Sequence, residues 1–144
     1  SEVEWKGVQS EQGTAPDQIF AIEIDGERQY IFLEIDQGTE TIEPGGRRQQ
    51  SETFWHNTSI LRKFLIYAHA FRTQAHKEQF GLPVFRVLTV TTSPGRVVAM
   101  QELYPKTIVL MALITLLLIT HLKKQFYASI SIMRKIKVVN SRYK

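Results

Sequence analysis

Three carboxylates stand at the ends of two apolar runs near the start of this chain. Asp17 precedes the run QIFAIEI, and Glu34 and Asp36 close the run QYIFLEID. Carboxylates form strands poorly and are costly to bury, so their presence here needs a physical reason. Hard oxygen ligands of this kind favour Mg²⁺ or Mn²⁺. We therefore expect Asp17, Glu34 and Asp36 to bind a divalent metal ion; the alternative is a solvated sheet face that binds nothing.

The two apolar runs predict a hairpin that would bring these carboxylates together. Both runs alternate in side-chain character, and Asp25-Gly26 between them is a strong signal for a two-residue turn. A two-residue loop would place Asp17 opposite Glu34, whereas a four-residue loop would place it opposite Asp36. Like charges directly opposite each other destabilise a sheet, and a bound cation would relieve that repulsion.

The remaining sequence predicts an α/β (α+β) domain with the core order β-β-α-β-α. Alternation predicts strands, helical apolar spacing predicts helices, and glycine and proline mark their ends. The strand expected over 84–91 is apolar almost throughout, which is typical of a strand covered on both faces. The predicted elements are a loop or frayed strand over 1–14, strands over 18–24 and 29–36, a polar loop over 37–57, a helix over 58–79 capped by Thr58 or Ser59, the strand over 84–91 and a helix over 93–104 that starts at Pro94.

Length and composition narrow the classes of function. The chain has 144 residues, which fits one domain of ordinary size. It has no cysteine, which excludes disulfides and thiolate-bound zinc and leads us to expect a cytoplasmic protein. The sequence contains no Walker A loop, no Gly-x-Gly-x-x-Gly run and no Gly-x-Ser-x-Gly elbow. Nucleotide-dependent and serine-hydrolase chemistry therefore have no support.

Charge is distributed unevenly along the chain. Residues 1–44 carry a net charge of −9, residues 45–106 carry +6 and residues 107–144 carry +7. We expect a domain over 1–106 and a separate tail over 107–144 that is apolar and then basic. The fourteen-residue apolar run at the start of that tail is shorter than the roughly 20 residues that span a bilayer. The tail is then an anchor at a membrane surface, a buried element, or an end without a native role.

Several short motifs together resemble the replication-relaxation family, bacterial proteins associated with plasmid replication and mobilisation. The resemblance covers roughly residues 5–104 and implies a PD-(D/E)XK nuclease-like fold, a restriction-endonuclease-like mixed sheet with flanking helices. The motifs are Pro16-Asp17, then Glu34-Ile35-Asp36-Gln37-Gly38-Thr39, then Lys63 with Tyr67 one helical turn later, and then Arg86-Val87-Leu88.

The resemblance implies catalytic roles for Asp17, Glu34, Asp36 and Lys63. The nuclease pattern has a lysine where Asp36 stands, so Lys63 from the following helix would supply the amine. Lys63 would orient a water or stabilise negative charge, or would accept a proton if partial burial lowered its pKa. Tyr67 is either a core residue or, less in keeping with its neighbours, a nucleophile. Positive side chains for the DNA phosphates come from the segment of charge +6, namely Arg47, Arg48, Arg62 and Lys77.

The expected function is that of a DNA-associated protein of plasmid replication or mobilisation, with Mg²⁺- or Mn²⁺-dependent DNA endonuclease activity. One alternative is a non-catalytic module of the same fold that binds DNA, a replication protein or a relaxase. A further alternative is a membrane-associated interaction protein that depends on residues 107–144. Metal-dependent cleavage of plasmid DNA separates the first two classes, and binding to liposomes tests the third.

Overall fold

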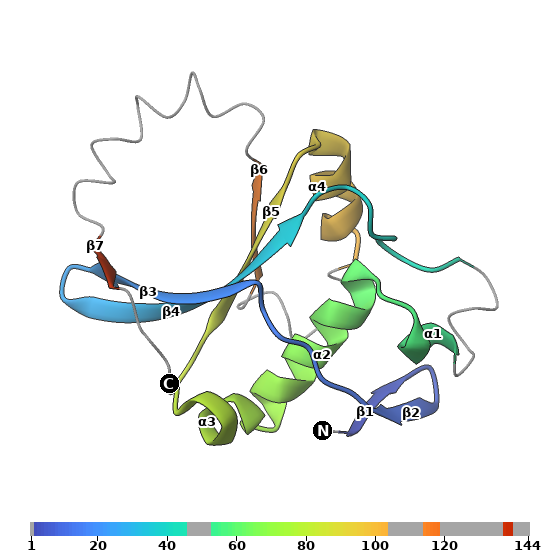
Figure 1. Ribbon diagram of the computed structural model, residues 1–144, viewed down its shortest axis with the longest axis horizontal. Helices are drawn as coiled ribbons and strands as arrows, with labels where there is room; N and C mark the ends of the chain where they lie inside the picture. Colours follow the sequence, from blue (N-terminus) through green and yellow to red (C-terminus); the bar gives the residue numbers. More distant parts are fainter. Residues whose placement is uncertain (1, 46–52, 104–113, 119–136, 140–144) are drawn as a thin grey trace.

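The computed structural model describes residues 2–45, 53–103, 114–118 and 137–139 and contains one mixed five-stranded sheet, one two-stranded hairpin and four helices. The predicted α/β (α+β) class and the core order β-β-α-β-α are confirmed (Figure 1). In spatial order, the strands of the large sheet are β6 (Ile114–Leu118), β5 (Arg86–Thr91), β4 (Glu27–Asp36), β3 (Gln18–Ile24) and β7 (Lys137–Val139).

The β3–β4 hairpin turns at Asp25-Gly26, as the sequence predicts. Asp25 has φ 52° and Gly26 has φ 85°, so both central residues adopt the left-handed backbone that a tight hairpin turn requires. Gln18 pairs with Leu33 in the antiparallel register, which is the pairing that a two-residue loop gives. Asp17 precedes Gln18 and Glu34 follows Leu33, so this register places Asp17 opposite Glu34. The alternative prediction of a four-residue loop, which would place Asp17 opposite Asp36, is wrong.

Residues 2–11 form a hairpin rather than the expected loop or frayed strand. Strand β1 (Glu2–Trp5) pairs in antiparallel register with β2 (Val8–Glu11). The turn between them uses Lys6 with φ 49° and Gly7 with φ 83°. The polar composition of this segment conceals the hairpin: among its described side chains only Val3 is buried in the core, so the apolar pattern that marks a strand is weak.

The helix predicted over 58–79 is broken in two. Gln74 adopts φ 63°, and the Thr73 hydroxyl donates to the carbonyl of His69 at 2.9 Å, which ends the first helix. His76 then packs between the rings of Phe71 and Phe85, so the second helix runs in a new direction. A short helix also stands inside the predicted polar loop. The four helices are α1 (Thr53–His56), α2 (Ile60–Arg72), α3 (Ala75–Phe80) and α4 (Pro94–Gln101).

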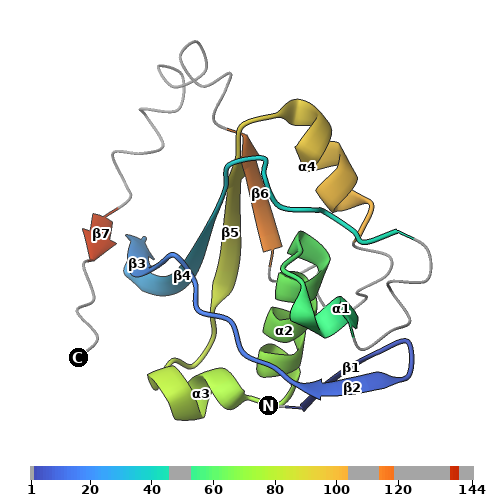
Figure 2. The same ribbon diagram turned by 45° about the vertical axis from the view of Figure 1, so that its right-hand side comes forward.

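Helices α2 and α4 cover the same face of the sheet (Figure 2). Strand β4 runs parallel to β5, and β5 runs parallel to β6. Crossovers between parallel strands are right-handed, so the helices that follow β4 and β5 are expected on one side of the sheet. The core lies between this face and α2 and is rich in aromatic rings. Phe32 stacks on Phe85 with ring centroids 4.4 Å apart, and Tyr67 meets Phe32 edge-on at 6.0 Å.

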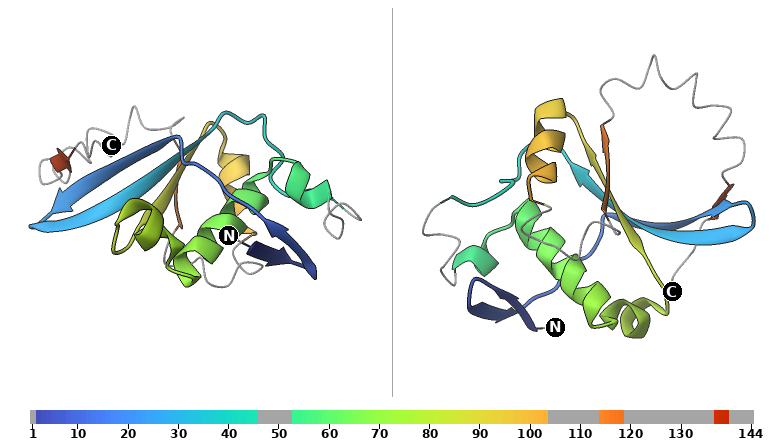
Figure 3. Two further views of the ribbon diagram at one scale, coloured as in Figure 1. Left: turned by 60° about the horizontal axis from the view of Figure 1, so that its bottom comes forward. Right: turned by 180° about the vertical axis from the view of Figure 1, so that it is seen from behind.

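The opposite face of the sheet is covered less completely than the sequence predicts. Strand β5 alternates between buried positions and the half-buried Leu88 and Val90, and Ile35 on β4 is 51% exposed. Burial on both faces of this strand is therefore not found among the described residues. In the two views of Figure 3, the described helices lie on the face of the sheet that α2 and α4 cover.

Two short pieces of the predicted tail pair with the large sheet. Strand β6 adds to β5 at one edge, and β7 adds to β3 at the other. The rest of residues 107–144 lies outside the described residues. This undescribed part includes most of the basic segment on which the membrane alternative depends. Within the described part of the chain, every helix is too short or too polar to cross a bilayer.

Candidate functional site

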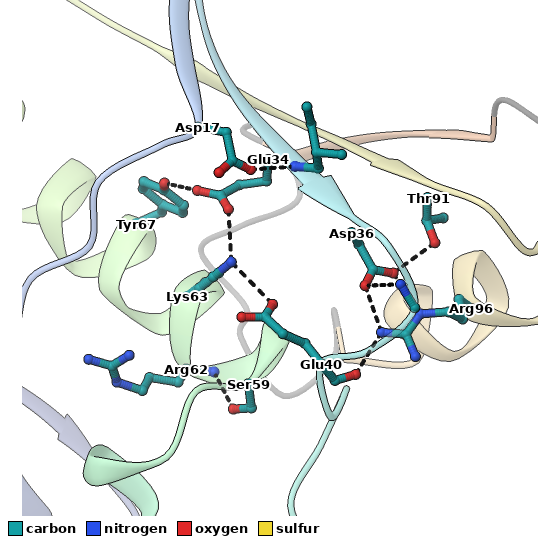
Figure 4. A network of polar contacts seen from close by, with 12 residues as sticks. Asp17, Glu34, Asp36, Glu40, Ser59, Arg62, Lys63, Tyr67, Thr91 and Arg96 are labelled. Atoms are coloured by element: carbon teal, nitrogen blue, oxygen red, sulfur yellow. Dashed lines mark hydrogen bonds and ion pairs between the residues drawn. The ribbon is translucent and has the colours of Figure 1, made fainter.

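Asp17 and Glu34 meet at the point where β3 begins and β4 ends (Figure 4). The backbone N–H of Asp17 donates to the carbonyl of Leu33 at 2.9 Å, and its carboxylate Oδ2 accepts from the N–H of Ile35 at 2.7 Å. These two bonds hold the exposed Asp17 side chain beside β4. Glu34 points toward α2 and is only 3% exposed, so its charge needs partners inside the protein.

Helix α2 supplies those partners from two positions one turn apart. Lys63 Nζ lies 3.1 Å from Glu34 Oε2, and the Tyr67 hydroxyl donates to Glu34 Oε1. Lys63 also lies 3.1 Å from Glu40 Oε2, so it bridges two carboxylates. The start of the helix is fixed by Ser59, whose hydroxyl accepts from the N–H of Arg62 at 3.1 Å and thereby confirms one of the two predicted caps.

The environment keeps Lys63 charged. Burial alone would lower the pKa of Lys63, but the charge of Glu34 and the hydrogen bonds to Glu34 and Glu40 outweigh it and raise the pKa above its usual value. The expectation that burial would turn Lys63 into a proton acceptor is therefore wrong. Burial and the neighbouring Glu34 also raise the pKa of Tyr67, so its phenol stays protonated and does not resemble an activated nucleophile.

Asp36 makes different contacts from Glu34, although both lie on the same face of β4. Its two oxygens receive Arg96 Nε at 2.6 Å and Arg96 Nη2 at 2.9 Å, and the Thr91 hydroxyl donates to it at 2.7 Å. The N–H of Gly38 adds a bond of 3.0 Å. Burial opposes ionisation here, but these hydrogen bonds prevail and lower the pKa of Asp36. Asp36 thereby fastens the end of β4 to α4.

The three predicted metal ligands thus fall into a pair and a separate residue. Asp17 and Glu34 lie together, whereas the Asp36 carboxylate is turned toward Arg96 (Figure 4). Among the residues that the structure describes, no three histidine or carboxylate side chains are grouped so that they could hold a metal ion. Of the three predicted ligands, only Asp17 and Glu34 lie side by side in the structure.

Sequence reasoning missed Glu40, Thr91 and Arg96. Thr91 is the partner of Asp36 in the parallel β4–β5 register, and that register could not be derived before the sheet order was known. Arg96 binds the Asp36 carboxylate, and its Nη2 also donates to the backbone carbonyl of Glu40 at 2.7 Å. In the sequence Arg96 lies 60 residues after Asp36 and 56 residues after Glu40. No motif marked these residues, because each owes its place to contacts between elements far apart in the chain.

Two of the predicted DNA-binding cations are described, and they lie on different helices: Arg62 on α2 and Lys77 on α3. Arg62 is half-buried and donates to Gln12 Oε1 from Nη2 at 2.6 Å and from Nε at 3.2 Å, which ties α2 to the end of β2. Burial lowers the pKa of Arg62 despite the nearby Glu40. Lys77 is exposed on α3, beyond the C-terminal end of α2. Arg47 and Arg48 lie outside the described residues.

Comparison of the chain with protein-family models, with curated proteins and with solved structures finds no match. The resemblance to the replication-relaxation family therefore stays a prediction, and the functional argument depends on the side chains of the site.

Proposed function

We propose that this chain is a DNA-associated domain of plasmid replication or mobilisation that cleaves phosphodiester bonds with the help of Mg²⁺ or Mn²⁺. The observation that carries the proposal is the contact between Lys63 Nζ and Glu34 Oε2 at 3.1 Å, directly beside Asp17. Two carboxylates and an ammonium group at the end of a hairpin are the residue types that metal-assisted phosphoryl transfer uses.

The donor set suits a magnesium-type ion. Mg²⁺ in proteins is commonly held by one or two carboxylates, with waters and substrate phosphates completing its shell. Asp17 and Glu34 supply two such carboxylates. Thr89, the neighbour of Glu34 on β5, has a buried hydroxyl for which the described residues provide no hydrogen-bond partner. A bound ion supplies polarisation of the phosphate and a more acidic water.

Each side chain then has a defined part in the chemistry. Asp17 is exposed and faces an arriving strand first, while Glu34 is held in place by Tyr67 and Lys63. Lys63, charged at neutral pH, offsets negative charge that develops on the phosphate oxygens in the transition state. Tyr67 acts as a positioning residue, since its hydroxyl fixes the Glu34 carboxylate rather than the substrate.

The test is cleavage of supercoiled plasmid by the full chain in Mg²⁺ or Mn²⁺. Asp17→Asn, Glu34→Gln and Lys63→Met should each reduce the cleavage rate by about 100-fold or more. Arg28→Met is the matched control, because Arg28 is an exposed cation at the other end of β4. A wild-type chain that leaves plasmid intact in both metals, or a rate that survives all three substitutions, would refute the catalytic proposal.

Metal binding is measured separately from cleavage. Saturating Mg²⁺ should raise the melting temperature of the wild-type chain, because a ligand that binds the folded state stabilises it. The double variant Asp17→Asn, Glu34→Gln should show no such rise. Equal stabilisation of the two proteins would remove Asp17 and Glu34 as metal ligands.

A non-catalytic module of the same fold is the second candidate. Both oxygens of Glu34 already have partners in Tyr67 and Lys63, and Lys63 is shared with Glu40, so the network is satisfied by protein groups. Such a module would bind DNA, a replication protein or a relaxase through this surface without cutting. DNA binding in a gel-shift assay, combined with no cleavage in either metal, would favour this candidate.

A further inference from the structure

A cavity of about 250 Å³ lies next to the candidate site and has no part in the chemistry described above. It is bordered by the segment that leaves β2, by Phe32 of β4, by α2 and by α3. Tyr67 forms one wall, and its hydroxyl binds Glu34, so one side chain separates the cavity from the carboxylate and from Lys63. Pockets for drug-sized ligands measure roughly 300–1,000 Å³, so this cavity suits a smaller, fragment-sized group.

Flat apolar rings make up much of the wall. Phe32, Tyr67 and Phe80 all border the cavity, with Phe32 and Phe80 edge-on at 5.3 Å and Phe32 and Tyr67 at 6.0 Å. Phe32 and Tyr67 are only 2% and 3% exposed and contact each other, so a planar guest ring would lie against their edges and against the half-buried Phe80. Nucleobases pack on aromatic side chains of proteins in a comparable way.

Amide and hydroxyl groups stand at the same cavity. Gln12, Thr14 and Gln79 border it. The Gln12 amide is fixed by protein groups, because its oxygen accepts twice from Arg62 and its Nε2 donates to Ser10 Oγ at 2.8 Å. The exposed Gln79 amide at the same cavity can hydrogen-bond the polar edge of a heteroaromatic ring.

The cavity wall is not strongly charged. His69 borders it, and burial together with the charge of Arg72 lowers the pKa of His69, so its ring is neutral at neutral pH. His76, also at the wall, contacts the backbone carbonyls of Ala70 at 3.0 Å and Pro83 at 3.4 Å. A neutral ring fits this environment better than a phosphate does.

We propose that this cavity binds one unstacked nucleobase of a single-stranded DNA segment whose backbone passes the Asp17–Glu34–Lys63 site. This inference rests on the proposed function for the identity of the strand, and it adds the group that the protein recognises. Tyr67 contacts both regions: its ring borders the cavity, and its hydroxyl binds Glu34. The cavity would thereby set which phosphodiester bond lies at the carboxylates.

The test is fluorescence-anisotropy binding of the full chain to short single-stranded DNA in EDTA, so that no cleavage is needed. The wild-type chain should bind a base-bearing strand at least about five-fold more tightly than an abasic strand of the same length, since stacking of one base is worth that factor or more. Ala70→Leu fills the cavity from α2, and Ala75→Leu fills it from α3. Each should bind both strands alike, at the wild-type affinity for the abasic strand.

Ala99→Leu is the matched control, because Ala99 is half-buried on α4 and does not border the cavity. It should keep the wild-type preference for bases. No base preference in the wild-type chain, or a preference that survives in a folded cavity-filling variant, would overturn the proposal. The two proposals fail separately: cleavage without base preference removes only the cavity's role, and base preference without cleavage removes only the catalytic role.

Discussion

Replacing Arg96 with methionine should destabilise the protein strongly, although Arg96 lies in no predicted motif. The Asp36 side chain is 1% exposed and Arg96 is 19% exposed, so the pair is largely shielded from water. Removing one partner of a buried ion pair costs about 3–5 kcal/mol, because the other charge remains buried. Thr91 and Gly38 keep two hydrogen bonds to Asp36, so we place Arg96→Met at the lower limit, about 3 kcal/mol.

Urea unfolding followed by tryptophan fluorescence measures this loss, since Trp55 is buried and reports on the folded core. In a thermal unfolding experiment, the melting temperature of Arg96→Met should be lower than that of the wild type by roughly 10 °C for a chain of this size. Arg86→Met is the control: Arg86 is exposed on β5, and its loss should change stability by about 0.5 kcal/mol or less.

The double variant Asp36→Asn, Arg96→Met separates the charge from the packing. If the uncompensated carboxylate causes the loss, neutralising it should restore at least about 1 kcal/mol relative to Arg96→Met alone. A single variant within about 1 kcal/mol of the wild type, or a double variant that is less stable than Arg96→Met, would refute the argument.

Acid titration gives an independent measurement of the same pair. The pKa of Asp36 is lowered in the folded state, so its contribution to stability is present above the unfolded value of about 3.9. That contribution is lost as pH falls through the lower folded-state pKa. Arg96→Met should therefore show a shallower loss of unfolding free energy on acidification than the wild type, and an unchanged slope would contradict the assignment.

Three further predictions concern the site and its supports. Lys63 and Tyr67 both have raised pKa values in the folded state, so the stability that these two groups contribute should be fully present below about pH 10 and should be lost as pH rises above it. Lys63→Met and Tyr67→Phe should each make that alkaline loss of unfolding free energy shallower. Ser59→Ala should cost about 1 kcal/mol in urea unfolding because it removes the cap of α2, whereas Ser93→Ala, at a cap position without a side-chain bond, should cost clearly less. Gly26→Ala should cost about 1 kcal/mol or more, since φ 85° is strained for any residue with a Cβ; an unchanged melting temperature would show that the turn can relax.

The local parts of this fold could be predicted from the sequence. Alternating residues and Asp25-Gly26 specify the β3–β4 hairpin, because side-chain period and turn geometry depend on neighbours in the chain. The same local information placed Asp17 opposite either Glu34 or Asp36 and gave Thr58 or Ser59 as the cap. The folded chain selects Glu34 and Ser59. The break between α2 and α3 was missed because the position of His76 against Phe71 and Phe85 is a tertiary contact.

Glu34 and Asp36 on β4 show which properties of the site follow from the sequence and which follow from the tertiary structure. The sequence by itself determined that Glu34 and Asp36 share one face of a strand, since alternate residues always do. Only the folded chain decided that Glu34 meets Lys63 and Tyr67 while Asp36 meets Arg96 and Thr91. The reason is that two different helices cross that face, and the position of each follows from the parallel order of β4, β5 and β6, which no local pattern encodes.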